Sequence, residues 1–267
     1  MHTEITEKVA RKVLSVVDRG LSSGVGVRKP GQMCVEAAVC YALGLPHGDD
    51  PACVSRALRS LKINLNDRTW SSNKARASGL RRLAVAQLGS YGHLDDIEFI
   101  RRVAELAIRT CVPQALRSAA SIHKDPTHVQ ALRDAANKCE REPTEKNSRK
   151  AQAAATAANA ATACVADAAY AAAYAAATAA NAYATAATAT AAAAYAADAA
   201  AYAAYANADA ATAATAAAYA VARDKSLADF AEGVVQILIA MDAPGVKWLA
   251  LTEALNNNRM GLSSAQR

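Results

Sequence analysis

Residues 166–190 read ADAAYAAAYAAATAANAYATAATAT and lie within a tract, residues 151–220, in which 46 of 70 residues are Ala. Neither Gly nor Pro occurs anywhere in the tract. Because Ala has the highest helix propensity of the amino acids, the tract is predicted to be strongly helical. A single helix of this length would extend for about 105 Å, so a compact protein is expected to fold it back on itself. Asn and Asp favour turns, and we expect breaks near Asn181 and near residues 207–209.

The larger side chains of the tract are spaced alternately by three and four residues, which places them on one helical face. They include Asp167, Tyr170, Tyr174, Thr178, Asn181, Tyr195, Asp198, Tyr202, Tyr205 and Asp209. The other faces carry mostly methyl groups, so close helix packing is expected within the chain or between chains, and we expect a homo-oligomer. Two interpretations of the Tyr residues stay open. They supply the bulk that Ala lacks, or they present an aromatic surface to a ligand or a protein, with Tyr170, Tyr174, Tyr202 and Tyr205 as the candidates.

Apolar residues also occur at helical spacing before and after the tract, and no convincing strand pattern occurs. A first helix is predicted to begin after Thr3 or Thr6 and to end at Gly20. Further helices are expected over residues 32–43, 50–65, 72–88, 95–110, 113–122, 126–140, 226–241 and 244–255. The fold class is therefore all-α: an N-terminal bundle of short helices, then long alanine-rich helices that could form a hairpin, then two short C-terminal helices.

The charged segment REPTEKNS, residues 141–148, is the best candidate for a boundary between domains. The expected division is a basic helical domain (1–140), an alanine- and tyrosine-rich helical region (149–222), C-terminal helices (223–255) and a disordered tail (256–267). No export signal is visible at the N-terminus, and the Asp residues of the tract argue against a membrane span. A cytoplasmic protein with six reduced cysteines is expected.

Positive charge is concentrated in the first 150 residues, which hold 25 Lys and Arg against 16 Asp and Glu, whereas the whole chain has a net charge of +6. This asymmetry favours an anionic partner, although a solvated basic surface is the alternative. No run of consecutive basic residues suggests an extended nucleic-acid interface. The candidate ligand-binding residues are cations that would hold phosphates and aromatic residues that would stack on a base. They are Arg28, Lys29, Arg56, Arg59, Arg81, Arg82, Trp70 and Tyr91.

A second cluster combines thiols, an imidazole and carboxylates. It comprises Cys34, Cys40, His47, Asp49, Asp50 and Cys53. These residue types could bind zinc, but no C-x-x-C or H-x-x-x-H pair is present, and neither a metal nor a cofactor is expected. A nucleophilic pair of Cys34 and His47 is conceivable. Small apolar cysteines buried in a core are the favoured explanation, with Asp50 and Pro51 starting a helix.

Two segments carry a resemblance to known families. The segment GQMCVEAAVCYALGLPHGDDPACVSRAL, residues 31–58, resembles part of uncharacterised phage and actinobacterial proteins with the pattern G-x-M-C-V-x-E-A-V, a Gly-containing turn and D-x-P-x-C-V. The matching residues are Met33, Cys34, Val35, Ala38, Pro51, Cys53 and Val54. The segment departs from that pattern at His47 and Gly48, where those proteins have Trp and Ser. The alanine tract is similar to alanine-rich helical arrays of immunity proteins from bacterial toxin systems, and together the resemblances imply a setting of phage or defence conflict.

From these patterns we expect a non-enzymatic binding protein, associated with phage, that sequesters an anionic small molecule such as a nucleotide immune signal and so opposes host defence. The first alternative is an immunity-type or inhibitory protein whose surface blocks a partner protein of the host. The second alternative is an enzyme that uses the Cys34 and His47 region. The absence of a GxxxxGK[ST] or GxGxxG loop means that any phosphate would be held by side chains rather than by a glycine-rich loop.

Overall fold

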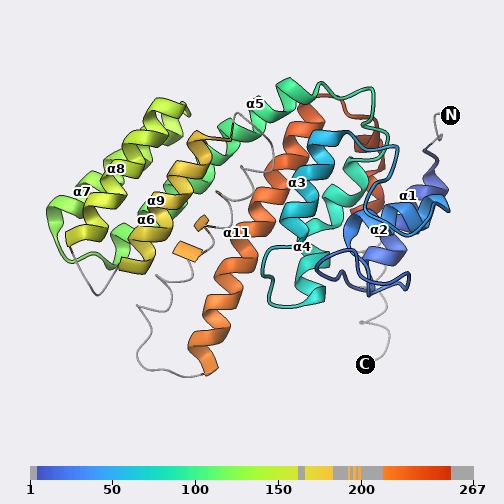
Figure 1. Cartoon of the computed structure of the whole chain (residues 1–267), viewed down its shortest axis with the longest axis horizontal. Helices are drawn as coiled ribbons and strands as arrows, with labels where there is room; N and C mark the ends of the chain where they lie inside the picture. The colour runs from blue at the N-terminus through green and yellow to red at the C-terminus, as the bar shows by residue number, and fades with distance from the viewer. Residues whose placement is uncertain are drawn as a thin grey trace.

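The structure is a computed structural model, and it describes residues 5–161, 166–182, 192, 195–196, 198–199 and 213–253. Within these residues every regular element is a helix, and β-type pairing is limited to an isolated bridge between Gly26 and Met33. The predicted all-α class is therefore confirmed (Figure 1).

Short helices precede the alanine-rich tract, and most begin within one residue of a predicted start. They are α1 (Glu7–Val17), α2 (Val35–Leu43), α3 (Arg56–Asn66), α4 (Asn73–Ala86), α5 (Asp96–Leu106), the π-helical turn η1 (Ala107–Cys111), α6 (Val112–Ile122) and α7 (Pro126–Arg141). The side chains of Thr6, Ser72 and Asp95 cap α1, α4 and α5 by accepting hydrogen bonds from N–H groups of the first turn. Such caps satisfy backbone donors that a helix leaves unpaired, so these starts follow from local sequence.

The start of α3 differs from the prediction. Asp50 and Pro51 do not begin this helix; Ser55 caps it, and its hydroxyl accepts from the N–H of Leu58 at 3.3 Å. The N–H of Ser55 also donates to the hydroxyl of Ser90 at 2.9 Å, so a contact with the loop after α4 holds the cap in place. As a result, the carboxylate of Asp50 lies outside the helix.

The alanine-rich tract is folded back rather than straight. It contributes α8 (Glu145–Ala161) and α9 (Ala166–Ala180), which lie side by side in Figure 1 and contact each other along their lengths. Buried alanines line the contact, and the hydroxyl of Ser148 donates to the carbonyl of Ala176 at 2.7 Å. The expected alanine-lined packing within the chain and the break near Asn181 are confirmed. The break expected near residues 207–209 lies outside the described residues.

The helix α11 (Ala213–Ala240) packs against α4 and α5 (Figure 1). The prediction that a helix starts at Ser226 is wrong, because this residue lies inside α11. Its hydroxyl donates to the carbonyl of Ala222 at 3.1 Å and accepts from the side-chain amide of Gln114. A 3₁₀ turn, η2 (Pro244–Trp248), begins where the last helix was expected. The expected disordered tail lies outside the described residues.

One hydrophobic core connects the N-terminal helices with α6–α9 and α11. The five described cysteines are free and buried, as expected for core thiols, whereas Cys164 lies outside the described residues. The predicted boundary at residues 141–148 contains the turn between α7 and α8 and the first residues of α8. Among the described residues no single helix has the length and apolar character needed to cross a membrane, although the bent pair Ala217–Ala240 and Pro244–Glu253, at 112°, meets that criterion jointly by length and composition.

Candidate functional site

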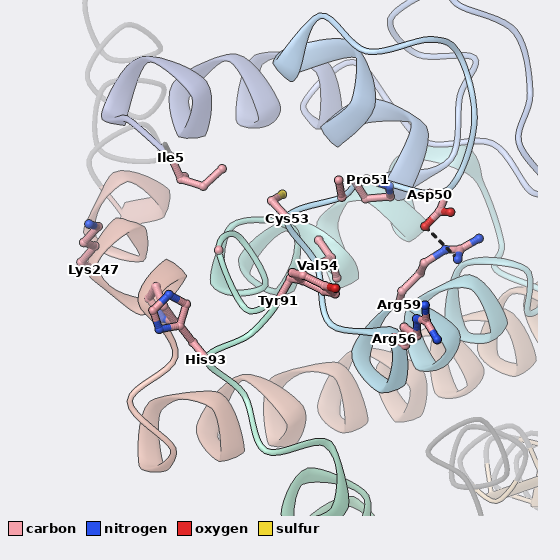
Figure 2. Close-up of a pocket in the computed structure, with 13 residues that line it drawn as sticks. Ile5, Asp50, Pro51, Cys53, Val54, Arg56, Arg59, Tyr91, His93 and Lys247 are labelled. Atoms are coloured by element: carbon pink, nitrogen blue, oxygen red, sulfur yellow. Dashed lines mark ion pairs between the residues drawn. The ribbon is translucent and has the colours of Figure 1, made fainter. Parts of the chain in front are cut away.

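A pocket of about 820 Å³ opens where five segments meet: the segment before α1, the loop before α3, the first turn of α3, the loop after α4, and η2. Figure 2 shows Arg56 and Arg59 at one end of it, His93 and Lys247 at the other, and Tyr91 between them. The full lining consists of Ile5, Asp50, Pro51, Ala52, Cys53, Val54, Arg56, Arg59, Gly89, Tyr91, His93, Pro244 and Lys247.

Backbone contacts between two loops fix the shape of this pocket. Besides the bond between Ser55 and Ser90, the N–H of Tyr91 donates to the carbonyl of Cys53 at 3.1 Å. Gly89 has a φ of +78°, in the left-handed region that favours glycine, and a Cβ there would lie 3.3 Å from the Cβ of Pro244. The loop after α4 is therefore held on one side by the loop before α3 and packs on the other side against η2.

Arg56 is the cation most available to a ligand. It is the first residue of α3, its side chain is exposed, and it forms no ion pair within the part of the chain that the structure describes. The first turn of α3 contains no acidic residue. Since the N-terminus of a helix is its positive end, a cation there is locally unfavourable and an anion would be favoured. Within the described residues, the guanidinium of Arg56 therefore has no carboxylate partner at this positive helix end.

Two further permanent cations line the pocket. Arg59 lies one turn along α3 and contacts Asp49 and Asp50, and Lys247 places its Nζ 4.9 Å from the centroid of the Trp248 ring. Asp50 is the acidic side chain among the lining residues. Arg56, Arg59 and Lys247 outnumber the carboxylates of Asp49 and Asp50 that contact Arg59, so the pocket keeps an excess of positive charge, which attracts anions.

Tyr91 supplies a flat apolar surface beside these charges. Its side chain is 49% exposed although its backbone is held by Cys53. An exposed ring on an anchored stretch of backbone can stack on a planar ligand. The fold thus brings together three of the sequence candidates, Arg56, Arg59 and Tyr91.

The other basic and aromatic candidates of the N-terminal half lie elsewhere. Arg28 and Lys29 are on an exposed loop, where the guanidinium of Arg28 lies 5.9 Å from the centroid of the Tyr41 ring. Arg81 pairs with Asp18 at 2.7 Å, and Arg82 pairs with Glu232 at 3.0 Å.

Both arginines are therefore engaged by carboxylates of the fold and are not available to a ligand.

Trp70 is a core residue. It is buried, its indole N–H donates to the carbonyl of Leu65 at 3.1 Å, and its ring packs against Gly79. A ring in this position has no open face on which a base could stack.

The tyrosine candidates of the alanine-rich tract do not line this pocket as far as they are described. Tyr174 is exposed on α9, with its ring centroid 5.2 Å from that of Tyr195. Tyr170 is placed on α9 by its backbone alone. Tyr202 and Tyr205 lie outside the described residues.

His93 and Lys247 belong to the pocket and were not among the sequence candidates. His93 follows Tyr91 closely in the chain, so a search for polar neighbours of that ring would have found it. Lys247 is far away in sequence and reaches the pocket because η2 packs against α4. No local pattern signals that arrangement.

The geometry at Cys34 and His47 does not resemble an activated nucleophile. The thiol of Cys34 caps α2 by accepting from the N–H of Ala37 at 3.3 Å, and burial raises its pKa. The Nε2 of His47 instead lies 3.0 Å from the carbonyl of Gly26. A reactive cysteine needs a lowered pKa, so this environment opposes thiolate formation. Within the described residues, no group of three or more His, Cys, Asp or Glu side chains is arranged to hold a metal ion.

A buried charged pair lies close to the pocket. Glu36 of α2 and Lys62 of α3 form an ion pair of 3.3 Å, and neither side chain has exposed surface. Burial raises the pKa of Glu36, and the charges of Lys62 and Arg59 oppose that shift. Arg59 and Cys53, which line the pocket, both interact electrostatically with Glu36, so the pair lies near the pocket.

Comparison with known proteins provides no relative: no protein-family model, no curated protein and no solved structure matches the chain. The resemblance to phage proteins and to immunity proteins therefore stays a prediction.

Proposed function

We propose that this protein binds an anionic small molecule with a planar ring, such as a nucleotide, in the pocket between Arg56 and Lys247. Arg56 and Arg59 hold the anionic groups, and Tyr91 stacks on the ring. The pocket volume of about 820 Å³ lies within the range of about 300–1,000 Å³ that is typical of small-molecule sites.

One observation carries the proposal: Arg56, exposed at the positive end of α3 and without an ion pair in the described part of the chain, lines the same pocket as an exposed Tyr91. Other arginines of the N-terminal half, such as Arg81 and Arg82, are engaged by carboxylates. Arg56 has no such partner among the described residues, and an anion would provide one.

We propose binding without turnover as the form of this function. Cys53 is the thiol in the lining, and burial raises its pKa, which disfavours a nucleophilic thiolate. We therefore propose that the protein captures and sequesters its ligand, as the sequence suggested for a nucleotide signal.

The first test is to denature the purified protein and to identify released small molecules by mass spectrometry. The second test is to titrate ATP, ADP and AMP into the protein by calorimetry and to compare Arg56→Glu with the control Lys29→Glu, which reverses an exposed charge away from the pocket. Arg56→Glu should weaken nucleotide binding by about ten-fold or more, because it removes a charge-assisted contact and adds repulsion. Lys29→Glu should leave the affinity unchanged.

Tyr91→Ala tests the ring-binding part of the proposal. Loss of a stacked ring should weaken binding by about five-fold or more. It should not weaken binding of inorganic pyrophosphate, which has no ring. Failure of the wild-type protein to bind any of the three nucleotides, or equal effects of Arg56→Glu and Lys29→Glu, would overturn the proposed function.

A further inference from the structure

Arg59 is held by two neighbouring carboxylates in different ways. On one side its Nε donates to the carbonyl of Asp49 at 2.7 Å, and its Nη2 lies 3.3 Å from the Oδ1 of the same residue. On the other side its Nη1 lies 2.9 Å from the Oδ1 of Asp50, the contact drawn in Figure 2. Asp49 does not line the pocket, whereas Asp50 does.

The two contacts also differ in how firmly they are fixed. Asp49 binds Arg59 through its backbone as well as its side chain, and 35% of that side chain is exposed. The side chain of Asp50 is 77% exposed. Within the described residues the Asp50 carboxylate has no hydrogen bond or ion pair besides Arg59, since α3 is capped by Ser55 instead. An exposed ion pair of this kind contributes little to stability, and its carboxylate can rotate into solvent.

We propose that Asp50 is an internal counter-anion that occupies the anion position at Arg59 until a ligand displaces it, and that it thereby sets the affinity and charge selectivity of the pocket. The inference rests on the proposed function. Asp49 keeps the guanidinium oriented while Asp50 leaves, so Arg59 presents Nη1 to the incoming anionic group. A ligand must carry enough negative charge to compete with the Asp50 carboxylate for Arg59. Neutral ligands and ligands with little negative charge cannot do so.

The site therefore fits a ligand with at least two anionic oxygens positioned for Arg56 and Arg59, as a phosphate or diphosphate group has. Both arginines are on α3, at its first residue and three residues later, so they lie on the same side of the helix. Asp50 pairs with Arg59, whereas Arg56 has no ion pair within the described residues. Removing the Asp50 charge should make both cations available without changing the ring-binding surface of Tyr91.

Asp50→Asn tests this role, and Glu253→Gln is a matched control. Glu253 is also an exposed carboxylate, with 76% of its side chain accessible, and it pairs with Arg82 at 3.4 Å outside the pocket lining. The two variants change net charge equally, so a general electrostatic effect would appear in both. Calorimetric titration with ATP and with inorganic pyrophosphate measures the affinities, and thermal unfolding checks that both variants fold.

Asp50→Asn should strengthen binding of both probes by about two- to five-fold, the effect of losing an exposed competing ion pair. Glu253→Gln should have no measurable effect, because Glu253 pairs with Arg82 and neither residue lines the pocket. If wild-type protein binds ATP but Asp50→Asn binds it equally or more weakly, the inference is overturned and the proposed function stands. Equal strengthening by both variants also overturns it. Absence of binding by every variant and the wild type overturns the proposed function itself.

Discussion

Replacing Lys62 with Met should destabilise the protein strongly, because it leaves the carboxylate of Glu36 buried without its cation. The pair joins α2 to α3 at 3.3 Å, and both side chains are fully inaccessible to solvent. Removing one partner of a buried ion pair typically costs about 3–5 kcal/mol of unfolding free energy. That loss is a large part of the total of about 5–15 kcal/mol that stabilises a native domain. Glu36→Gln should destabilise for the complementary reason, since it leaves a buried ammonium.

The double variant Glu36→Gln/Lys62→Met should lie close to wild type in stability. It removes both charges, and replacing a buried ion pair with well-packed hydrophobic residues of similar volume is often neutral or stabilising. The Gln at position 36 still buries an amide, which costs less than burying an unpaired charge. The double-mutant cycle should therefore show a large favourable coupling between the two residues. This result would separate the electrostatic role of the pair from its packing.

The single variants should also respond to pH in opposite directions. Burial raises the pKa of Glu36 above its ordinary value of 4.5, and in Lys62→Met no neighbouring ammonium lowers it. The folded state then keeps a proton that the unfolded chain releases, so stability falls as pH rises above 4.5. Burial lowers the pKa of Lys62 below 10.5, so in Glu36→Gln the unfolded chain binds the extra proton and stability rises with pH toward that value. Each slope is limited to about 1.4 kcal/mol per pH unit.

Urea denaturation followed by far-UV circular dichroism at several pH values measures these effects. The reasoning would be refuted if Lys62→Met unfolded with the wild-type free energy and without a pH slope, because a solvated carboxylate would behave in that way. It would also be refuted if the double variant lost the sum of the two single effects, because the residues would then act independently.

Two further predictions concern packing and a tautomer. Gly245→Ala should lower the unfolding free energy by about 1–3 kcal/mol, because the new Cβ would lie 2.4 Å from a backbone carbonyl oxygen. Gly233→Ala should cost less in the same denaturation assay, because its Cβ would meet only the flexible side chain of a leucine. His123 should be the Nε2–H tautomer, because the N–H of Asp125 donates to its Nδ1 at 3.1 Å and its Nε2 lies 3.3 Å from the carbonyl of Ala158. Nitrogen-15 NMR shifts of the ring measure this, and a protonated Nδ1 in the neutral ring would contradict it.

Local sequence was sufficient to predict the end of a helix where that end depends on neighbouring residues. Thr6 caps α1 as predicted, and α4 and α5 begin within one residue of their predicted starts, where Ser72 and Asp95 cap them. In each case the side-chain oxygen and the N–H groups it binds are within three residues. The end of α9 at Ala180, beside Asn181, follows the same principle. Prediction failed at Asp50 and at Ser226. Ser55 displaces Asp50 as the cap because it is held by Ser90, and Ser226 is engaged by Gln114 inside a continuous α11.

Only part of the candidate site could be predicted from the sequence. Arg56 and Arg59 were predicted as phosphate-binding cations, and Tyr91 as an aromatic residue that stacks on a base. Arg81 and Trp70 had the same sequence appearance, yet they are bound to Asp18 and to the carbonyl of Leu65. Whether a cation or a ring is free for a ligand depends on partners that are distant in the chain, so composition and spacing could not separate these residues.

The amino-acid sequence by itself determined that the protein is all-α, because the helix propensity of Ala, the caps and the apolar spacing act over only a few residues. It also determined that the alanine-rich tract turns near Asn181. Tertiary structure alone decided that η2 brings Lys247 to the loop of Tyr91, that Glu36 and Lys62 are buried together, and that Arg56 is left without a counter-charge among the described residues. These features depend on packing between segments that are far apart in the chain, and the free energy of that packing is not encoded in any local pattern.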